Sequence, residues 1–136
     1  VLLGHAVEMA EVLREMIEAQ PRLCVMNRDN VGPVTLFRVY PKDVDTFKVK
    51  DREQQDKTYR DRLLAHNDLN RQIYERVHAE ALAGSGVAIS LTDCYRRTDY
   101  GEPINALKSY IVSPFADESQ MRSVLTHVLN AAGREA

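Results

Sequence analysis

Apolar residues recur at two different spacings along the chain, and these spacings divide it into helices and strands. Spacings of three and four residues are typical of a helix that buries one face, and they occur in three segments. The first ends before Pro21, which cannot continue a helix; the second runs from about Lys57 to Ala83, and the third begins near Asp117. The apolar stripes of the three are Ala6, Met9, Ala10, Leu13, Met16 and Ile17; Tyr59, Leu63, Leu69, Ile73, Val77 and Ala81; and Met121, Val124, Leu125, Val128 and Leu129.

Short apolar runs between these helices are rich in β-branched and aromatic residues, which is typical of strands. The predicted strands are 23–26, 34–40, 87–91 and 104–112. Segment 27–33 is rich in Asn, Asp, Gly and Pro and predicts a turn. Segments 41–57 and 92–103 are rich in charge and predict solvated loops.

The helix ends carry recognisable signals. Gly84 and Gly86 offer a left-handed cap for the second helix, and Asp117 with Gln120 has the spacing of a capping box at the start of the third. The element order is therefore α-β-β-α-β-β-α. Adjacent strands with short links favour a largely antiparallel four-stranded sheet with helices packed on it, an α+β fold.

Length and composition narrow the possible functions. The 136 residues fit one domain, 1–136, and 44% apolar with 28% charged residues is ordinary globular composition. A net charge of −2 gives no basic surface for nucleic acid or for an anionic membrane. Cys24 and Cys94 lie in strand-like surroundings, so we expect both to be reduced and buried, which suits a cytoplasmic protein.

Alternation along two strands brings cations and tyrosines to one side of the predicted sheet. This side, the mixed face, carries Leu36, Arg38, Tyr40, Ala106, Lys108, Tyr110 and Val112. An unpaired charge buried under a helix is costly, so we expect the mixed face to meet another domain or a ligand cleft. Alternatively, both cations extend into water at the sheet edge.

Catalytic and metal-binding motifs are not found. The four histidines are isolated on helical patterns, and in the best pairing with an acid, His78 and Glu80, the residues are two positions apart, where helical side chains do not face each other. No nucleotide-binding glycine loop or nucleophile motif occurs. We therefore expect neither a metal site nor a complete set of catalytic residues.

The fourth predicted strand and the last helix carry a family resemblance; they read INALKSYIVSPFADESQMRSVLTHVL. This segment is similar to the end of the group II pyridoxal-phosphate (PLP) decarboxylases, which act on glutamate, aromatic amino acids and 2,4-diaminobutyrate. There an asparagine and a strand lead into an Asn-Pro or Ser-Pro turn before a capped helix, here Asn105, Ser113, Pro114 and Asp117. The runs VTLFRVYP and GSGVAISLTDCYR resemble earlier strands of the same domain, in the same order.

The resemblance implies a fold, a cofactor and partners. Residues 1–136 would be the C-terminal small domain of an aspartate-aminotransferase-type fold, without the large cofactor-binding domain. The intact enzyme would be a homodimer that uses PLP to decarboxylate an amino acid, whereas this chain alone would bind no PLP.

The chain departs from the family in its lysines. The cofactor lysine of the family usually follows a histidine, and none of Lys42, Lys48, Lys50, Lys57 and Lys108 does. No catalytic residue is therefore assigned.

The resemblance offers two substrate-binding candidates, Lys108 and Asn105. Lys108 matches a position in strand 104–112 where some members have an arginine that contacts the substrate carboxylate. Alternatively, Lys108 pairs with an acid of the large domain, or it is a solvated lysine at the sheet edge.

Two further interpretations of the whole chain remain open. One is the small domain of an aminotransferase or another lyase of the same fold. The other is a free-standing α+β module that binds a ligand. A complete gene that continues upstream and encodes a His-Lys pair would favour the enzyme domain over the module.

Overall fold

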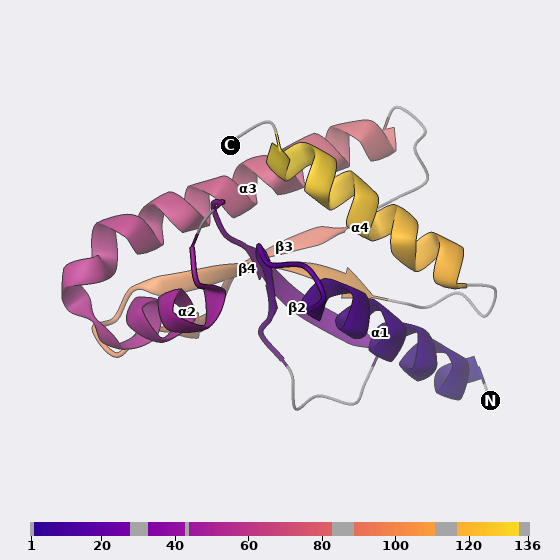
Figure 1. Ribbon diagram of the computed structural model, residues 1–136, viewed down its shortest axis with the longest axis horizontal. Helices are drawn as coiled ribbons and strands as arrows, with labels where there is room; N and C mark the ends of the chain where they lie inside the picture. Colours follow the sequence, from indigo (N-terminus) through magenta and orange to yellow (C-terminus); the bar gives the residue numbers. More distant parts are fainter. Residues whose placement is uncertain (1, 28–32, 43, 83–88, 111–116, 134–136) are drawn as a thin grey trace.

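The computed structural model describes residues 2–27, 33–42, 44–82, 89–110 and 117–133 (Figure 1). Within them the elements are, in order, α1 (Leu2–Glu18), β1 (Leu23–Val25), β2 (Val34–Val39), α2 (Thr46–Gln55), the 3-10 helix η1 (Lys57–Tyr59), α3 (Arg60–Leu82), β3 (Ser90–Arg97), β4 (Pro103–Tyr110) and α4 (Glu118–Gly133). The α+β class and the helix and strand order predicted from the sequence are confirmed, with α2 and η1 as additions.

The four strands form one sheet in the order β1-β2-β4-β3, and every neighbouring pair is antiparallel. β1 and β3 are the edge strands. In the centre, Leu36 of β2 lies opposite Lys108 of β4, which lies opposite Ser90 of β3. The predicted antiparallel sheet is therefore confirmed, and Lys108 lies on a central strand.

Three helices, α1, α3 and α4, cover one face of the sheet, and their apolar stripes form the main core with it (Figure 1). The fully enclosed members of this core include Leu13 and Ile17 of α1, Ile73 and Val77 of α3, Val128 of α4, and Phe37, Val39 and Leu107 of the sheet. The 3.6-residue period in the sequence therefore marks the core face of each helix correctly.

A smaller cluster lies on the opposite face, under α2. It contains Cys24, Tyr40, Val49 and Tyr59, with Met26 and Val44 packed against it. Side chains alternate along a strand, so Cys24 and Tyr40 point away from the main core that their neighbours Leu23 and Val39 enter. α2 is thus held against the sheet by few apolar contacts.

The prediction of a solvated loop at 41–57 was wrong, because α2 and η1 occupy most of it. The Asp45 side chain caps α2, accepting hydrogen bonds from Phe47 N at 3.1 Å and Lys48 N at 3.3 Å. Only Thr46, Val49 and Glu53 of α2 are buried. A helix with so narrow a buried stripe gives a weak periodic signal, so the sequence pattern missed it.

The predicted loop at 92–103 was also wrong, because β3 continues to Arg97 and forms a hairpin with β4. The hairpin turn closes through Thr98 N and Glu102 O, at 2.8 Å, and Gly101 takes the positive φ of 91° that glycine tolerates. Most β3 side chains are exposed or half-buried. Such a polar edge strand lacks the apolar alternation from which strands are predicted.

Three expectations fall wholly or partly outside the described residues: the turn at 27–33, the Gly84–Gly86 cap, and the Ser113-Pro114 turn. The capping box is confirmed, since Gln120 N donates to Asp117 Oδ1 at 2.9 Å and Asp117 N donates to Gln120 Oε1 at 3.2 Å.

The expectation that both cysteines are buried was half right. Both are free thiols; Cys24 is buried, whereas Cys94 is exposed on the polar edge strand β3.

Candidate functional site

The central strands β2 and β4 separate beyond the pair Phe37 and Leu107, and a buried arginine fills the gap. Toward the end of β2, Phe37 and Leu107 are the last residues of the two strands that pair. The next residue, Arg38, donates from Nη1 to the Asn105 carbonyl oxygen at 2.7 Å and to Asn105 Oδ1 at 2.9 Å. A side chain therefore replaces the backbone pairing between the two strands.

The backbone of β2 is satisfied at the same point by Asn70 of α3. Val39 N donates to Asn70 Oδ1 at 2.8 Å, and Asn70 Nδ2 donates to the Val39 carbonyl at 2.9 Å. Asn70 Nδ2 also donates to the His66 carbonyl at 2.8 Å. The Asn70 amide thus bonds β2 as a neighbouring strand would, which keeps two buried peptide groups paired.

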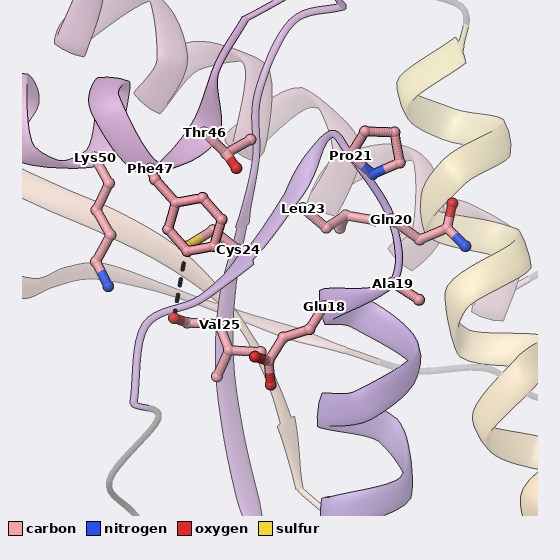
Figure 2. A pocket seen from close by; sticks show the side chains of 10 residues that line it. All are labelled: Glu18, Ala19, Gln20, Pro21, Leu23, Cys24, Val25, Thr46, Phe47 and Lys50. Carbon is pink, nitrogen blue, oxygen red and sulfur yellow. Dashed lines mark hydrogen bonds between the residues drawn. The ribbon is translucent and has the colours of Figure 1, made fainter.

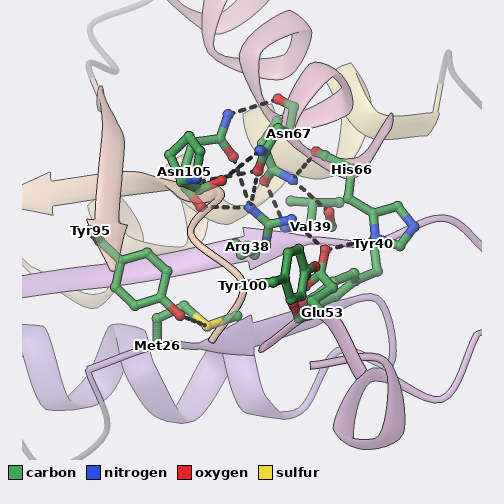
Figure 3. A network of polar contacts seen from close by, with 12 residues as sticks. Met26, Arg38, Val39, Tyr40, Glu53, His66, Asn67, Tyr95, Tyr100 and Asn105 are labelled. Atoms are coloured by element: carbon green, nitrogen blue, oxygen red, sulfur yellow. Dashed lines mark hydrogen bonds and ion pairs between the residues drawn. The ribbon is translucent and has the colours of Figure 1, made fainter. Parts of the chain in front are cut away.

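Glu53 of α2 is the acceptor at the centre of this network (Figure 3). Its carboxylate accepts from Arg38 Nη2 at 2.7 Å and from the Tyr40 hydroxyl at 2.8 Å, and His66 Nδ1 lies 2.9 Å from Oε2. The Tyr100 hydroxyl donates to the Glu53 carbonyl at 2.7 Å. Glu53 therefore joins α2 to β2, α3 and the β3–β4 turn.

The network is shielded from water. Arg38 is 0% exposed and Glu53 is 1% exposed, so each charge depends on the other for compensation. Burial raises the pKa of Tyr40 far above its ordinary value of 10.0, which keeps its hydroxyl protonated as a donor to Glu53. Arg38 Nε is buried without a partner. We conclude that the network stabilises the fold.

The two predicted substrate-binding residues lie on opposite faces of β4, because they are three positions apart in a strand. Asn105 is 1% exposed. Its Nδ2 donates to the Asn67 carbonyl at 2.7 Å, and its oxygen accepts from Arg38. Lys108 is half-buried, and its ammonium makes no hydrogen bond or ion pair within the described residues. Their roles toward a substrate stay predictions, and of the two Lys108 is the accessible one.

The mixed face proves to be two regions. At Arg38 and Tyr40 it is covered by α2, so the expectation that a helix would not cover Arg38 was wrong; Glu53 supplies the compensating charge. At Leu36 and Lys108 it is half-buried. Beside this second region the Tyr95 hydroxyl donates to Met26 Sδ at 3.3 Å. The side chains of Tyr110 and Val112 lie outside the described residues.

Sequence reasoning missed Glu53, His66, Asn67 and Asn70. A signal existed on α3: Leu69 is the single member of the predicted stripe between Leu63 and Ile73, and the other positions at helical spacing there are the polar His66 and Asn70. Polar residues inside an apolar stripe indicate buried hydrogen bonds. No comparable signal marks Glu53, which lies in a segment dominated by charge.

The described residues give no sign of a metal site. They contain no group of three or more His, Cys, Asp or Glu side chains placed to hold an ion. His66 is bonded to Glu53, and His127 Nδ1 lies 2.8 Å from Glu80 Oε2. None of the helices in these segments has the length and apolar character needed to cross a membrane.

Solved structures share this fold at low sequence identity. Catharanthus roseus tryptophan decarboxylase in complex with L-tryptophan is 14% identical, with a TM-score of 0.63 over 98% of this chain and 22% of that one. Oryza sativa TDC with PLP and tryptamine is 15% identical, with a TM-score of 0.67 over 98% and 23%. The glutamate decarboxylase domain of diaminobutyrate-pyruvate transaminase and L-2,4-diaminobutyrate decarboxylase from Vibrio parahaemolyticus is 17% identical, with a TM-score of 0.62 over 98% and 22%.

The chain has the fold of one part of the PLP-dependent decarboxylases. The resemblance stated from the sequence is thereby confirmed for the fold. The chain spans less than a quarter of each of these proteins, so their activities belong to much longer polypeptides. No family model matches the sequence, and no curated protein matches it.

The described residues do not fit PLP itself. The cofactor needs a lysine for its aldehyde and a group of donors for its phosphate. Lys50 is the lysine among the residues lining the described pockets, near the start of α2. There the Asp45 carboxylate already accepts from Phe47 N and Lys48 N, the helix N-terminal donors that would otherwise bind a phosphate. A carboxylate in that position repels a phosphate, so no PLP step is assigned to these residues.

Proposed function

We propose that this chain is the C-terminal small domain of a PLP-dependent amino-acid decarboxylase and that Lys108 faces the substrate cleft. One observation carries the proposal: the fold match covers 98% of this chain but only 22–23% of decarboxylase chains. A match that covers nearly all of this chain but a small part of a longer chain is expected of one domain of a larger enzyme. The cofactor lysine and the phosphate-binding donors would then come from another domain.

Lys108 is the residue proposed to meet the substrate. It lies on a central strand, it is partly accessible, and no acid in the described residues pairs with it. Its ammonium would offer the substrate carboxylate a point charge, without the two parallel hydrogen bonds that arginine provides. Asn105 would act as a positioning residue, because its bonds to Arg38 and Asn67 hold β4 in place.

The proposal extends to partners and location. The half-buried region at Leu36 and Lys108 would be covered by the large domain of the same chain, and the intact enzyme would be a homodimer. The free thiols Cys24 and Cys94 agree with a reducing compartment, which favours the cytoplasm.

Kinetics of the full-length protein that contains this chain would test the role of Lys108. With PLP present, we expect release of CO₂ from an amino acid. Lys108→Ala should lower kcat/KM at least about tenfold, which corresponds to about 1.4 kcal/mol of transition-state binding, with an unchanged melting temperature. Lys57→Ala is the matched control, because Lys57 is exposed in η1, and it should change neither quantity.

The alternatives give different results in the same experiment. If Lys108 only docks the domain, Lys108→Ala lowers the melting temperature together with activity. If both quantities are unchanged, the assignment of Lys108 is wrong. Transfer of the amino group to a keto acid, without release of CO₂, would identify an aminotransferase and overturn the decarboxylase proposal.

A further inference from the structure

A cavity of about 290 Å³ lies between the end of α1, the edge strand β1 and the start of α2 (Figure 2). Its volume is near the lower end of the range for small-molecule sites, about 300–1,000 Å³. It is lined by Glu18, Ala19, Gln20, Pro21, Leu23, Cys24, Val25, Thr46, Phe47 and Lys50. Lys108 and Asn105 are not among these residues, so this cavity is separate from the proposed substrate cleft.

Two hydrogen-bond donors at this cavity have no partner within the described residues. One is the Lys50 ammonium, which makes no hydrogen bond or ion pair with an acid or carbonyl of these residues. The other is the Val25 N–H. Tyr40 N donates to Arg22 O at 2.8 Å and Met26 N donates to Leu36 O at 2.7 Å, so the even-numbered residues along β1 and directly flanking it bond to the β2 side. By the alternation of an antiparallel pair, Val25 N–H points to the open edge of the sheet.

The cavity also has an apolar wall. Phe47 is 78% exposed, and among the described residues it is the large hydrophobic side chain that is exposed to solvent. Phe47 lines the cavity together with Leu23, Cys24 and Val25 (Figure 2). An aromatic ring in a ligand would pack against Phe47 and remove apolar surface from water.

The charges limit the ligand to one negative group. Glu18 lines the other side of the cavity and already takes part in an interaction within the chain. Its carboxylate disfavours a second anionic group on the ligand. The Asp45 carboxylate, which caps α2 next to Phe47, does the same.

We propose that this cavity binds a small aromatic monocarboxylate. The carboxylate accepts hydrogen bonds from Lys50 Nζ and Val25 N–H, and the ring packs on Phe47. This inference does not rest on the proposed decarboxylase function, because its residues and its ligand do not involve PLP or Lys108.

Titration of the ¹⁵N-labelled chain with 3-phenylpropionate tests the proposal by NMR. We expect saturable shifts of the Val25 and Phe47 amides. Lys50→Met should weaken binding at least about fivefold, as expected for loss of a charge-assisted hydrogen bond. Lys48→Met is the matched control: Lys48 is exposed on the same helix and does not line the cavity, so its loss should leave affinity unchanged.

Two ligand controls separate the carboxylate from the ring. The neutral 3-phenylpropionamide and the ringless propionate should each bind at least about fivefold more weakly than 3-phenylpropionate. Absence of saturable shifts at Val25 up to about 10 mM ligand would overturn the proposal. Equal weakening of binding by Lys50→Met and Lys48→Met would also overturn the proposal, because it would indicate that the ligand is attracted by the overall positive charge and not by Lys50.

Discussion

Arg38 of β2 and Glu53 of α2 form an ion pair of 2.7 Å in which the two side chains are 0% and 2% exposed. The residues lie fifteen positions apart, and their contact fastens the polar helix α2 to the sheet. Few apolar contacts hold α2 against the sheet, because Val49 is the hydrophobic residue of α2 that belongs to the smaller core cluster. The position of α2, and of the cavity beside it, therefore depends on this pair.

Glu53→Gln should be strongly destabilising. The substitution keeps the size of the side chain but leaves the Arg38 charge buried without compensation, and breaking a buried pair from one side costs about 3–5 kcal/mol. We expect a loss of about 3 kcal/mol in the free energy of unfolding, measured by urea denaturation. Glu102→Gln is the control, because its 2.8 Å pair with Arg60 is partly exposed and should be worth at most about 1 kcal/mol. Similar losses in the two variants would contradict the importance of burial.

Asn70→Ala tests the amide that bonds the β2 backbone. The substitution leaves Val39 N–H and C=O buried without partners, and each such group costs about 1–3 kcal/mol. We expect unfolding to become easier by at least about 2 kcal/mol. Asn130→Ala is the control, because Asn130 is exposed on α4; there alanine favours the helix slightly. A loss below about 0.5 kcal/mol for Asn70→Ala would show that water or another group satisfies Val39.

Much of the fold could be predicted from the sequence, because most helices and strands are marked by apolar residues at regular spacing or in short runs. The stripes containing Leu13, Ile73 and Val128 mark helix faces that enter the main core, and apolar runs locate β1, β2 and β4. These elements are formed by burial, which the pattern of apolar residues reports directly.

The parts that sequence analysis missed are formed by polar contacts between distant segments. α2 exists because Asp45 caps it and Glu53 binds Arg38, and neither contact leaves a periodic trace. The same holds for the candidate site. The resemblance pointed to Asn105 and Lys108, but the position of each relative to α2 and α3 depends on where β2 and β4 separate, which only the folded structure shows.

Asp117→Ala should remove a helix cap. Asp117 Oδ1 accepts from Gln120 N at 2.9 Å, and loss of such a cap costs about 1 kcal/mol. Asp117→Asn keeps a capping oxygen and should retain most of the stability. The neighbouring exposed Ser119→Ala is the control and should stay within about 0.5 kcal/mol of the parent chain. Thermal unfolding of the three variants would check this, and equal stability of Asp117→Ala and Asp117→Asn would contradict the capping role.

The two cysteines should react at very different rates with iodoacetamide. Cys94 is exposed on β3, whereas Cys24 is 7% exposed within the smaller cluster under α2. Burial also raises the pKa of the Cys24 thiol above its ordinary 9.0, and the thiolate is the reactive form. At a pH below 9.0 mass spectrometry should therefore find modification at Cys94 long before Cys24.

The pH dependence of iodoacetamide labelling distinguishes a raised pKa of the Cys24 thiol from simple blocking of the reagent by neighbouring side chains. Because the pKa of Cys24 is raised, the rate of its modification should still be rising at pH values above 9.0, measured in a Cys94→Ser chain. Val49→Ala shortens the α2 side chain that belongs to the same buried cluster as Cys24 and should increase the rate at every pH, because the thiol becomes more accessible and better hydrated. Lys48→Ala, on the exposed side of α2, should leave it unchanged. If Cys24 reacts as fast as Cys94 in the unaltered chain, α2 does not cover β1 in solution, and the cavity between them is not formed as described.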